Sequence, residues 1–200
     1  MSRIFVVIGK SASGKDTIYK KIVKDQSLGL KEVVGYTTRP IREGEENGVT
    51  YHFVSIDTLN KLLLENKVIE HRTYDTIHGP WHYFTVYDQQ INLQQDDYIM
   101  IGTLESFVQI REYFGKDAVV PIYIEVENGE RLERALGRER KQEHPKYEEM
   151  CRRFLADEQD FGEDKIEAAG ITKRFSNINF PACVESVTQY IKDTKKVDVN

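Results

Sequence analysis

The chain has few cysteines and no long hydrophobic segment near its start. Its 200 residues include two cysteines, Cys151 and Cys183, which lie far apart and form no CxxC pair. The sequence therefore offers neither a disulfide framework nor the cysteine spacing of a zinc site. The apolar run Ile4–Ile8 is too short for the core of a signal peptide and far too short to cross a membrane. We therefore expect a cytoplasmic protein without a membrane partner.

An excess of positive charge is also absent. The chain has 28 Lys and Arg against 33 Asp and Glu, which gives a formal net charge of −5. A mildly acidic chain is a poor candidate for binding nucleic acid through bulk charge, so we expect no nucleic-acid partner. A small anionic substrate stays open, because a local basic pocket is compatible with a negative total. With 40% hydrophobic and 30% charged residues, the composition is that of a globular domain, alone or with a small inserted lobe.

Hydrophobic periodicity predicts strands that alternate with helices. Strands are expected at Ile4–Ile8, Val33–Val34, Tyr51–Val54, Tyr98–Ile101, Ala118–Val126 and Lys173–Asn179. Helices are expected from Asp16 to about Asp25 and at Ile56–Lys67, Asn128–Arg140, Tyr147–Phe161 and Val184–Ile191. This alternation favours an α/β fold in which helices cover both faces of a parallel sheet. The strand-rich segment from about Val33 to Thr85 is predicted to form a smaller lobe inserted into it.

The most specific local pattern follows the first predicted strand. Two glycines separated by four residues, Gly9 and Gly14, precede Lys15, which is the spacing of a phosphate-binding P-loop. Backbone N–H groups of such a loop turn inward on a phosphate, the next helix adds its positive end, and the Lys contacts the β- and γ-phosphates. The residues expected to bind ATP here are Gly9, Ser11, Ala12, Ser13, Gly14, Lys15, Asp16 and Thr17. The alternative is a Gly/Ser-rich turn between strand and helix.

The residue after Lys15 departs from the usual P-loop. That position normally offers a hydroxyl to Mg²⁺, whereas here it is Asp16, with Thr17 next. Three arrangements are open: Thr17 contacts the metal, water mediates the contact, or Asp16 is itself a ligand. A carboxylate beside a triphosphate is tolerable only with a cation between them. Asp16 and Thr17 are therefore the candidate metal ligands.

A second polar segment, Thr37–Val54, contains residue types suited to a monophosphate. Arg39 and Arg42 offer two guanidinium groups three residues apart, and Tyr51 adds a neutral donor. Glu45 can accept hydrogen bonds from a base with N–H groups, as guanine has at N1 and N2. The alternative is a solvated charged loop, in which the arginines pair with Glu43, Glu45 or Glu46.

Arginines also gather further along the chain. Arg131, Arg134 and Arg138 share one face of a predicted helix, and Arg152 and Arg153 begin the exposed face of the next. Arginines over a transferring phosphate would stabilise its charge, and a mobile lid could supply them. The alternative is a set of i,i+4 surface pairs, Glu127–Arg131 and Glu130–Arg134. Spacing alone favours that pairing for Arg131.

In Thr37–Val54 the sequence resembles the guanylate kinases. Their nucleoside-monophosphate (NMP) lobe has a TTRxxRxGExxGxxYxFV signature, which this segment matches through its whole length. The resemblance continues more weakly to about Asn179. It implies a P-loop NTPase-type sheet flanked by helices (residues 1–34 and 86–200), an NMP-binding lobe (35–85) and a short helical lid near 137–153.

The resemblance also implies roles for individual residues. It assigns Glu70 to guanine, Tyr83 to the acceptor phosphate and Thr85 to the base. It selects Arg134, Arg138 and Arg153 as the phosphate contacts that act with Lys15, and places Asn177 at adenine. Together with the residues above, the expected GMP-binding set is Arg39, Arg42, Glu45, Tyr51, Glu70, Tyr83, Thr85 and Glu105.

Three segments differ from the family's pattern. Gly35 stands where a Ser or Thr of the family contacts the monophosphate, and the loop at Arg72–Trp81 is enlarged. The family's Asp-x-Asp after the strand ending near Ile101 is replaced by Ile101, Gly102 and Thr103. Glu105 is the nearest carboxylate that can substitute for these acids.

The leading interpretation is an ATP:GMP phosphotransferase that acts on GMP or dGMP with Mg²⁺, as a monomer or homodimer. One alternative is the same reaction on a different nucleotide or phosphorylated acceptor. Two others are a non-catalytic guanylate-kinase-like module that binds a phosphorylated peptide and a regulatory nucleotide sensor. The complete P-loop argues against the binding module, whereas the missing Asp-x-Asp keeps the sensor open.

Overall fold

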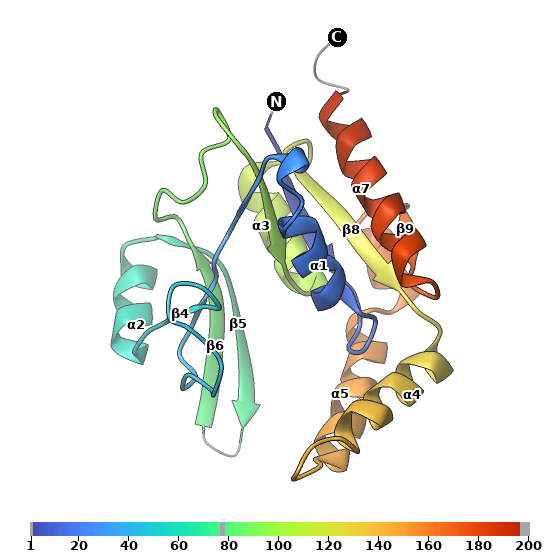
Figure 1. The fold of residues 1–200 in the computed structure, drawn as a ribbon. Coiled ribbons are helices and arrows are strands. Elements are labelled where there is room, and N and C mark those ends of the chain that lie inside the picture. Colours follow the sequence, from blue (N-terminus) through green and yellow to red (C-terminus); the bar gives the residue numbers. More distant parts are fainter. Residues whose placement is uncertain (1, 77–78, 197–200) are drawn as a thin grey trace.

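A five-stranded parallel sheet forms the centre of the molecule (Figure 1). The structure, a computed structural model, describes residues 2–76 and 79–196. The sheet has the order β2-β7-β1-β8-β9. Its strands are β1 (Ile4–Ile8), β2 (Leu30–Glu32), β7 (Asp97–Ile101), β8 (Val119–Glu125) and β9 (Arg174–Ser176). The predicted parallel sheet is confirmed, and all five residues of β1 are buried between its neighbours.

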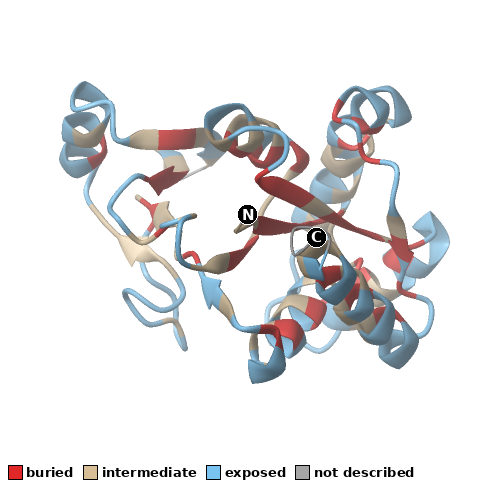
Figure 2. Ribbon diagram, turned by 90° about the horizontal axis from the view of Figure 1, so that it is seen from above, coloured by how far each residue is buried: buried red, intermediate tan, exposed pale blue. Residues whose placement is uncertain are grey.

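Helices cover both faces of this sheet because the strand side chains alternate between the faces. Phe5 and Val7 of β1 pack on one side with residues of α1 (Lys15–Val23) and α7 (Phe180–Lys196). Ile4 and Val6 pack on the other side with α3 (Leu104–Phe114) and α6 (Glu163–Ala168). Figure 2 shows the buried residues concentrated along these strands and the helix faces that meet them.

A second sheet forms a lobe beside the core. Its order is β4-β3-β6-β5, built from β3 (Tyr36–Thr37), β4 (His52–Phe53), β5 (Val68–Thr76) and β6 (Gly79–Val86). Helix α2 (Ile56–Leu64) packs on it through the buried Leu59, beside Phe84 and Val86. The strand-rich lobe predicted between residues 35 and 85 is present in the chain as a separate sheet.

The prediction that Arg72–Trp81 forms an enlarged loop was wrong. The described part of this segment is an antiparallel hairpin, in which β5 and β6 pair from Arg72↔Tyr83 to Thr76↔Gly79. Extra residues therefore lengthen two paired strands. Residues 77–78 lie outside the described residues.

Helices α4 (Asn128–Glu139) and α5 (Tyr147–Asp160) project from the core and correspond to the predicted lid (Figure 1). A 3₁₀ helix, Gln26–Leu28, follows α1. Several expected elements differ in extent. Val33–Val34 falls between β2 and β3, α2 ends at Leu64, the last strand is only Arg174–Ser176, and the final helix begins at Phe180. Within the described ranges, no helix combines the length and the apolar character that crossing a membrane requires.

Candidate active site

The P-loop lies between β1 and α1 and is shaped by close backbone approach. Gly14 has φ +85°, and a Cβ there would come within 2.3 Å of Asn177 Nδ2. A Cβ at Gly9 would lie 2.5 Å from the carbonyl oxygen of Ile124 on β8. Glycine is needed at both positions because any side chain would collide with the neighbouring strand or amide. The loop therefore wraps tightly against the carboxyl ends of the central strands.

Lys15 begins α1, so the positive end of that helix lies at the loop. Lys15 Nζ is 3.3 Å from Asp16 Oδ2, and the Asp16 side chain is 70% exposed. Thr17 is also exposed, and its N–H donates to the carbonyl of Gly14 at 3.0 Å. Within the described part of the chain, no group of three His, Cys, Asp or Glu side chains is placed to hold a metal. Asp16 still fits Mg²⁺, since that ion commonly takes one or two carboxylates and completes its shell with phosphate and water.

Asn177 is hydrogen-bonded to the backbone of the P-loop. Its Nδ2 donates to the carbonyl oxygen of Ser13 at 2.8 Å, and the residue is only 4% exposed. The amide is buried against the P-loop backbone, and its contact with adenine stays a prediction. Asn177 Oδ1 and Ser13 Oγ are buried without a hydrogen-bond partner among the described residues. Both atoms lie directly behind the loop that would hold the triphosphate.

Arg131 ties the lid to the P-loop. It is 1% exposed, and its Nε donates to the carbonyl oxygen of Ser11 at 3.0 Å. Its other nitrogens donate to Asn128 Oδ1 at 2.8 Å, Glu158 Oε1 at 2.7 Å and Asp157 Oδ2 at 3.0 Å. The same Asp157 oxygen accepts the Ser11 backbone N–H at 2.7 Å. Arg131 and Asp157 together therefore hold both backbone groups of Ser11.

The surface pair predicted for Arg131 was wrong. Glu127 instead caps α4 by accepting the N–H groups of Gly129 and Glu130. Arg131 faces inward over the ring of Phe154, at 4.7 Å from its centroid. A guanidinium can fill such a buried position because α5 supplies two carboxylates to it.

The lid arginines selected by resemblance lie near the P-loop to different degrees. Arg134 forms the predicted pair with Glu130, at 2.9 Å, and donates to the carbonyl oxygen of Asn177 at 2.9 Å. Arg153 of α5 lies 3.4 Å from Ser11 Oγ. Arg138 is exposed on α4. Arg153 thus contacts the P-loop directly, whereas Arg134 contacts Asn177, which bonds to the loop.

Three residues predicted to hold the acceptor phosphate, Arg39, Tyr51 and Tyr83, lie together in the lobe. Arg39 is 4% exposed, and its Nε donates to the Tyr83 hydroxyl at 3.1 Å. Its Cζ lies 5.3 Å from the centroid of the Tyr51 ring. Burial raises the pKa of Tyr51. Tyr51 therefore stays a neutral donor beside a buried cation.

Glu45 pairs with Arg39, and its contact with the base stays a prediction. Its two oxygens accept from Arg39 Nη1 and Nη2, each at 2.6 Å, and one also accepts the Arg42 backbone N–H at 2.8 Å. These hydrogen bonds, led by that from Arg39, lower the pKa of Glu45 to about 2. The Arg42 side chain is exposed, with its Cζ 5.8 Å from the Trp81 ring centroid. Glu45 is therefore the counter-ion that fixes Arg39.

A row of four hydrogen-bonded residues lies where the sequence predicts base contacts. Glu70 is 3% exposed, and its Oε1 accepts from the Thr85 hydroxyl at 2.8 Å. Its Oε2 accepts from Arg72 Nε at 3.0 Å, and Arg72 Nη1 lies 3.3 Å from Thr103 Oγ1. Burial alone would lower the pKa of Arg72, but the charge and hydrogen bond of Glu70, together with Tyr74 and Tyr51, outweigh it, so the pKa is raised. We call Thr85, Glu70, Arg72 and Thr103 the base row.

Sequence reasoning missed Arg72 and placed Glu105 differently. Glu70 and Arg72 are two apart on β5, so their shared face of the strand was the available signal. Glu105 lies in the first turn of α3, where it is exposed and accepts from Gln109 at 3.3 Å. Thr103, the N-cap of α3, occupies the row in place of the family's acid.

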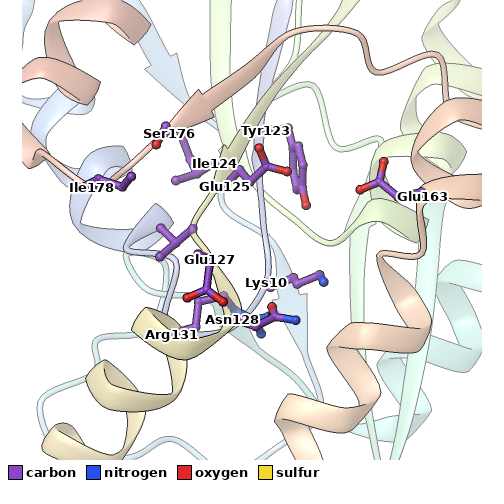
Figure 3. A pocket seen from close by; sticks show the side chains of 11 residues that line it. Lys10, Tyr123, Ile124, Glu125, Glu127, Asn128, Arg131, Glu163, Ser176 and Ile178 are labelled. Atoms are coloured by element: carbon purple, nitrogen blue, oxygen red, sulfur yellow. The ribbon is translucent and has the colours of Figure 1, made fainter.

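A cavity of about 420 Å³ opens beside the P-loop (Figure 3). Its lining comes from Lys10, the ends of β8 and β9, the start of α4 and Glu163. The cations at its wall are engaged: Lys10 pairs with Glu158 at 2.9 Å, and Arg131 has the contacts described above. Both cations at the cavity wall are therefore already paired with carboxylates.

The parallel sheet with its P-loop, inserted lobe and projecting helices has the architecture of the P-loop kinase fold. The guanylate kinase family model matches residues 1–167, and the chain belongs to the guanylate kinase family. The guanylate kinase of Helicobacter hepaticus is 29% identical over 138 residues, which cover 68% of this chain and 66% of that protein.

Two further curated guanylate kinases match over shorter segments. That of Schizosaccharomyces pombe is 43% identical over 65 residues, covering 32% of each chain. That of Neisseria gonorrhoeae is 40% identical over 68 residues, covering 34% of this chain and 33% of that one. The chain thus spans about a third of the length of the first curated relatives it matches. A crystal structure of guanylate kinase from Anaplasma phagocytophilum has a TM-score of 0.67 at 17% identity, covering 96% of this chain and 85% of that one, which shows the shared fold.

Proposed function

We propose that this protein transfers the γ-phosphoryl group of ATP to GMP or dGMP and releases ADP and the diphosphate. The observation that supports the proposal is the pairing of two anion sites in one molecule. One is the P-loop with Lys15, and the other is the buried Arg39 beside Tyr51 and Tyr83. A reaction between two phosphates needs such a pair, because the protein contributes position and charge instead of covalent chemistry.

The chain's own residues have distinct parts in this proposal. The P-loop amides and Lys15 hold the triphosphate, while Arg39 holds the acceptor phosphate. A phosphate oxygen of GMP attacks the γ-phosphorus, the bond to the bridging oxygen of ADP breaks, and charge spreads over the moving group. Arg134, Arg153 and Arg138 further along α4 stabilise that charge. Asp16 and Thr17 would hold Mg²⁺, which neutralises charge on the triphosphate when bound.

The base row supports a 6-oxopurine as the acceptor base. With GMP bound, N1–H of guanine donates to Glu70, the buried carboxylate of the row. Adenine offers no donor at N1, and a buried acceptor left without its donor costs more than the hydrogen bond contributes. We therefore expect GMP or dGMP to exceed AMP by at least about tenfold in kcat/KM.

The test is ADP release measured by a coupled assay with ATP and Mg²⁺ across GMP, dGMP, AMP, CMP and UMP. A matched Glu70→Gln variant keeps the size of the side chain and removes the charge. We expect the wild type to prefer guanine nucleotides and the variant to lose that preference. A wild type that prefers AMP or a pyrimidine would contradict the guanylate assignment, and one that needs no acceptor would contradict the kinase.

A further inference from the structure

Arg72 is the positively charged residue of the base row, beside the negatively charged Glu70. The row contains one buried anion, Glu70, and one buried cation, Arg72, whose side chains are 2% and 14% exposed. The guanidinium spans two parts of the fold, because Glu70 lies on β5 and Thr103 begins α3. Arg72 is thus fixed in position before any base arrives.

The base row has few hydrogen-bond acceptors besides Glu70. Glu45 is held by both guanidinium nitrogens of Arg39, and Glu105 is exposed on α3. The positions of the family's paired acids are Ile101 and Thr103. Glu70 is therefore the one carboxylate in the row, and each of its oxygens already accepts a hydrogen bond.

We propose that Arg72 is a specificity-determining residue that reads an oxo group adjacent to a ring N–H on the acceptor base. This inference rests on the proposed function, because a guanine-type acceptor fixes the order of the contacts. With N1–H donating to Glu70, the neighbouring O6 accepts from Arg72. Adenine in the same position would present an acceptor to the carboxylate and an amino group to the guanidinium, so both contacts would be repulsive.

A second consequence concerns the 2-amino group of guanine. A row with one anion and one cation matches one donor and one acceptor on the base. Hypoxanthine has the same O6 and N1–H edge as guanine and lacks only the 2-amino group. A neutral hydrogen bond contributes at most about tenfold in affinity, so IMP should bind within about tenfold of GMP.

The test is equilibrium binding of GMP, IMP and AMP by titration calorimetry, together with turnover of the same three acceptors. In Arg72→Ala, we expect GMP and IMP to bind about ten- to a hundredfold more weakly, the loss typical of one charge-assisted hydrogen bond. AMP binding should change by less than about threefold and the KM for ATP should be unchanged. Arg72→Lys keeps a charge beside Glu70 without the planar fork and should lose part of the preference.

Arg174→Ala is the matched control. Arg174 also pairs with two carboxylates, Glu125 and Glu163, but it lies on β9 at the far edge of the core sheet. It should leave the GMP-to-AMP ratio unchanged. Equal weakening of all three ligands in Arg72→Ala and in Arg72→Lys would overturn the inference and leave Arg72 a structural residue.

The two proposals fail in different ways. In one outcome, the protein binds GMP more tightly than AMP in a way that depends on Arg72, but it turns over no acceptor. That result would refute the proposed kinase activity and support the specificity role of Arg72. The opposite result is turnover of GMP with the same GMP-to-AMP binding ratio in the wild type and both variants. It would refute the specificity role of Arg72 and leave the proposed kinase activity intact. IMP binding more than about thirtyfold weaker than GMP would show that another acceptor reads the 2-amino group.

Discussion

Replacing Arg131 with Met should destabilise the protein more than any exposed arginine would. The side chain is 1% exposed and donates to four acceptors, two of them carboxylates on α5. Removing one partner of a buried ion pair costs about 3–5 kcal/mol, because the other charge is left uncompensated. Asp157 and Glu158 are 16% and 33% exposed, so water relieves part of that cost. We therefore expect a loss of about 3 kcal/mol in the free energy of unfolding.

The assay is urea or thermal unfolding at neutral pH. For a chain of this length a loss of that size lowers Tm by about 6–12 °C, from roughly 2–4 °C for each kcal/mol. Arg152→Ala is the control, since Arg152 pairs with Glu149 at the surface, with the two side chains 62% and 49% exposed. It should change stability by less than about 0.5 kcal/mol. A loss below about 1 kcal/mol in Arg131→Met would refute the reasoning that this guanidinium joins the lid to the P-loop.

Three further predictions concern the P-loop and the acceptor lobe. Lys15→Ala should abolish phosphoryl transfer while leaving Tm nearly unchanged, because Lys15 is assigned to the triphosphate; near-normal turnover would contradict the P-loop assignment. Gly14→Ala should destabilise the fold by at least about 1 kcal/mol in urea unfolding, because φ is +85° and the new Cβ would collide with Asn177; unchanged stability would mean that the loop is looser than described. The lowered pKa of Glu45 stabilises the protein above its ordinary value of 4.5, and this contribution is lost as pH falls toward 2. Glu45→Gln should therefore flatten the fall in stability between about pH 4.5 and 2 in acid unfolding, and a slope equal to that of the wild type would count against the pair with Arg39.

Local patterns predicted the parts of the site that depend on neighbouring residues. The P-loop spacing and the strand before it lie within a few residues of each other, so backbone conformation alone connects them. The Thr37–Val54 signature likewise identified Arg39, which the structure places in a buried cluster with Tyr51 and Tyr83. Periodicity also predicted β1, α1, β7, β8 and α4, but it did not identify β5, β6, α3 or α6.

Pairings between distant segments could not be read in the same way. Arg131 is four residues from Glu127, and that spacing suggested a surface pair, but its partners on α5 are 26 and 27 residues away. Asn177 meets Ser13 across 164 residues. Arg72 joins the base row because β5 packs on α3, a contact that the hydrophobic pattern of either segment does not specify.

The central claim is tested most directly by following the phosphoryl group itself. The protein would be incubated with Mg²⁺, GMP and ATP labelled at the γ-phosphate, and the labelled products separated. The account predicts label in the β-phosphate of GDP, formed in equal amount to ADP, with no label transferred by Lys15→Ala. Label that appears only in inorganic phosphate, or none that leaves ATP, would contradict it.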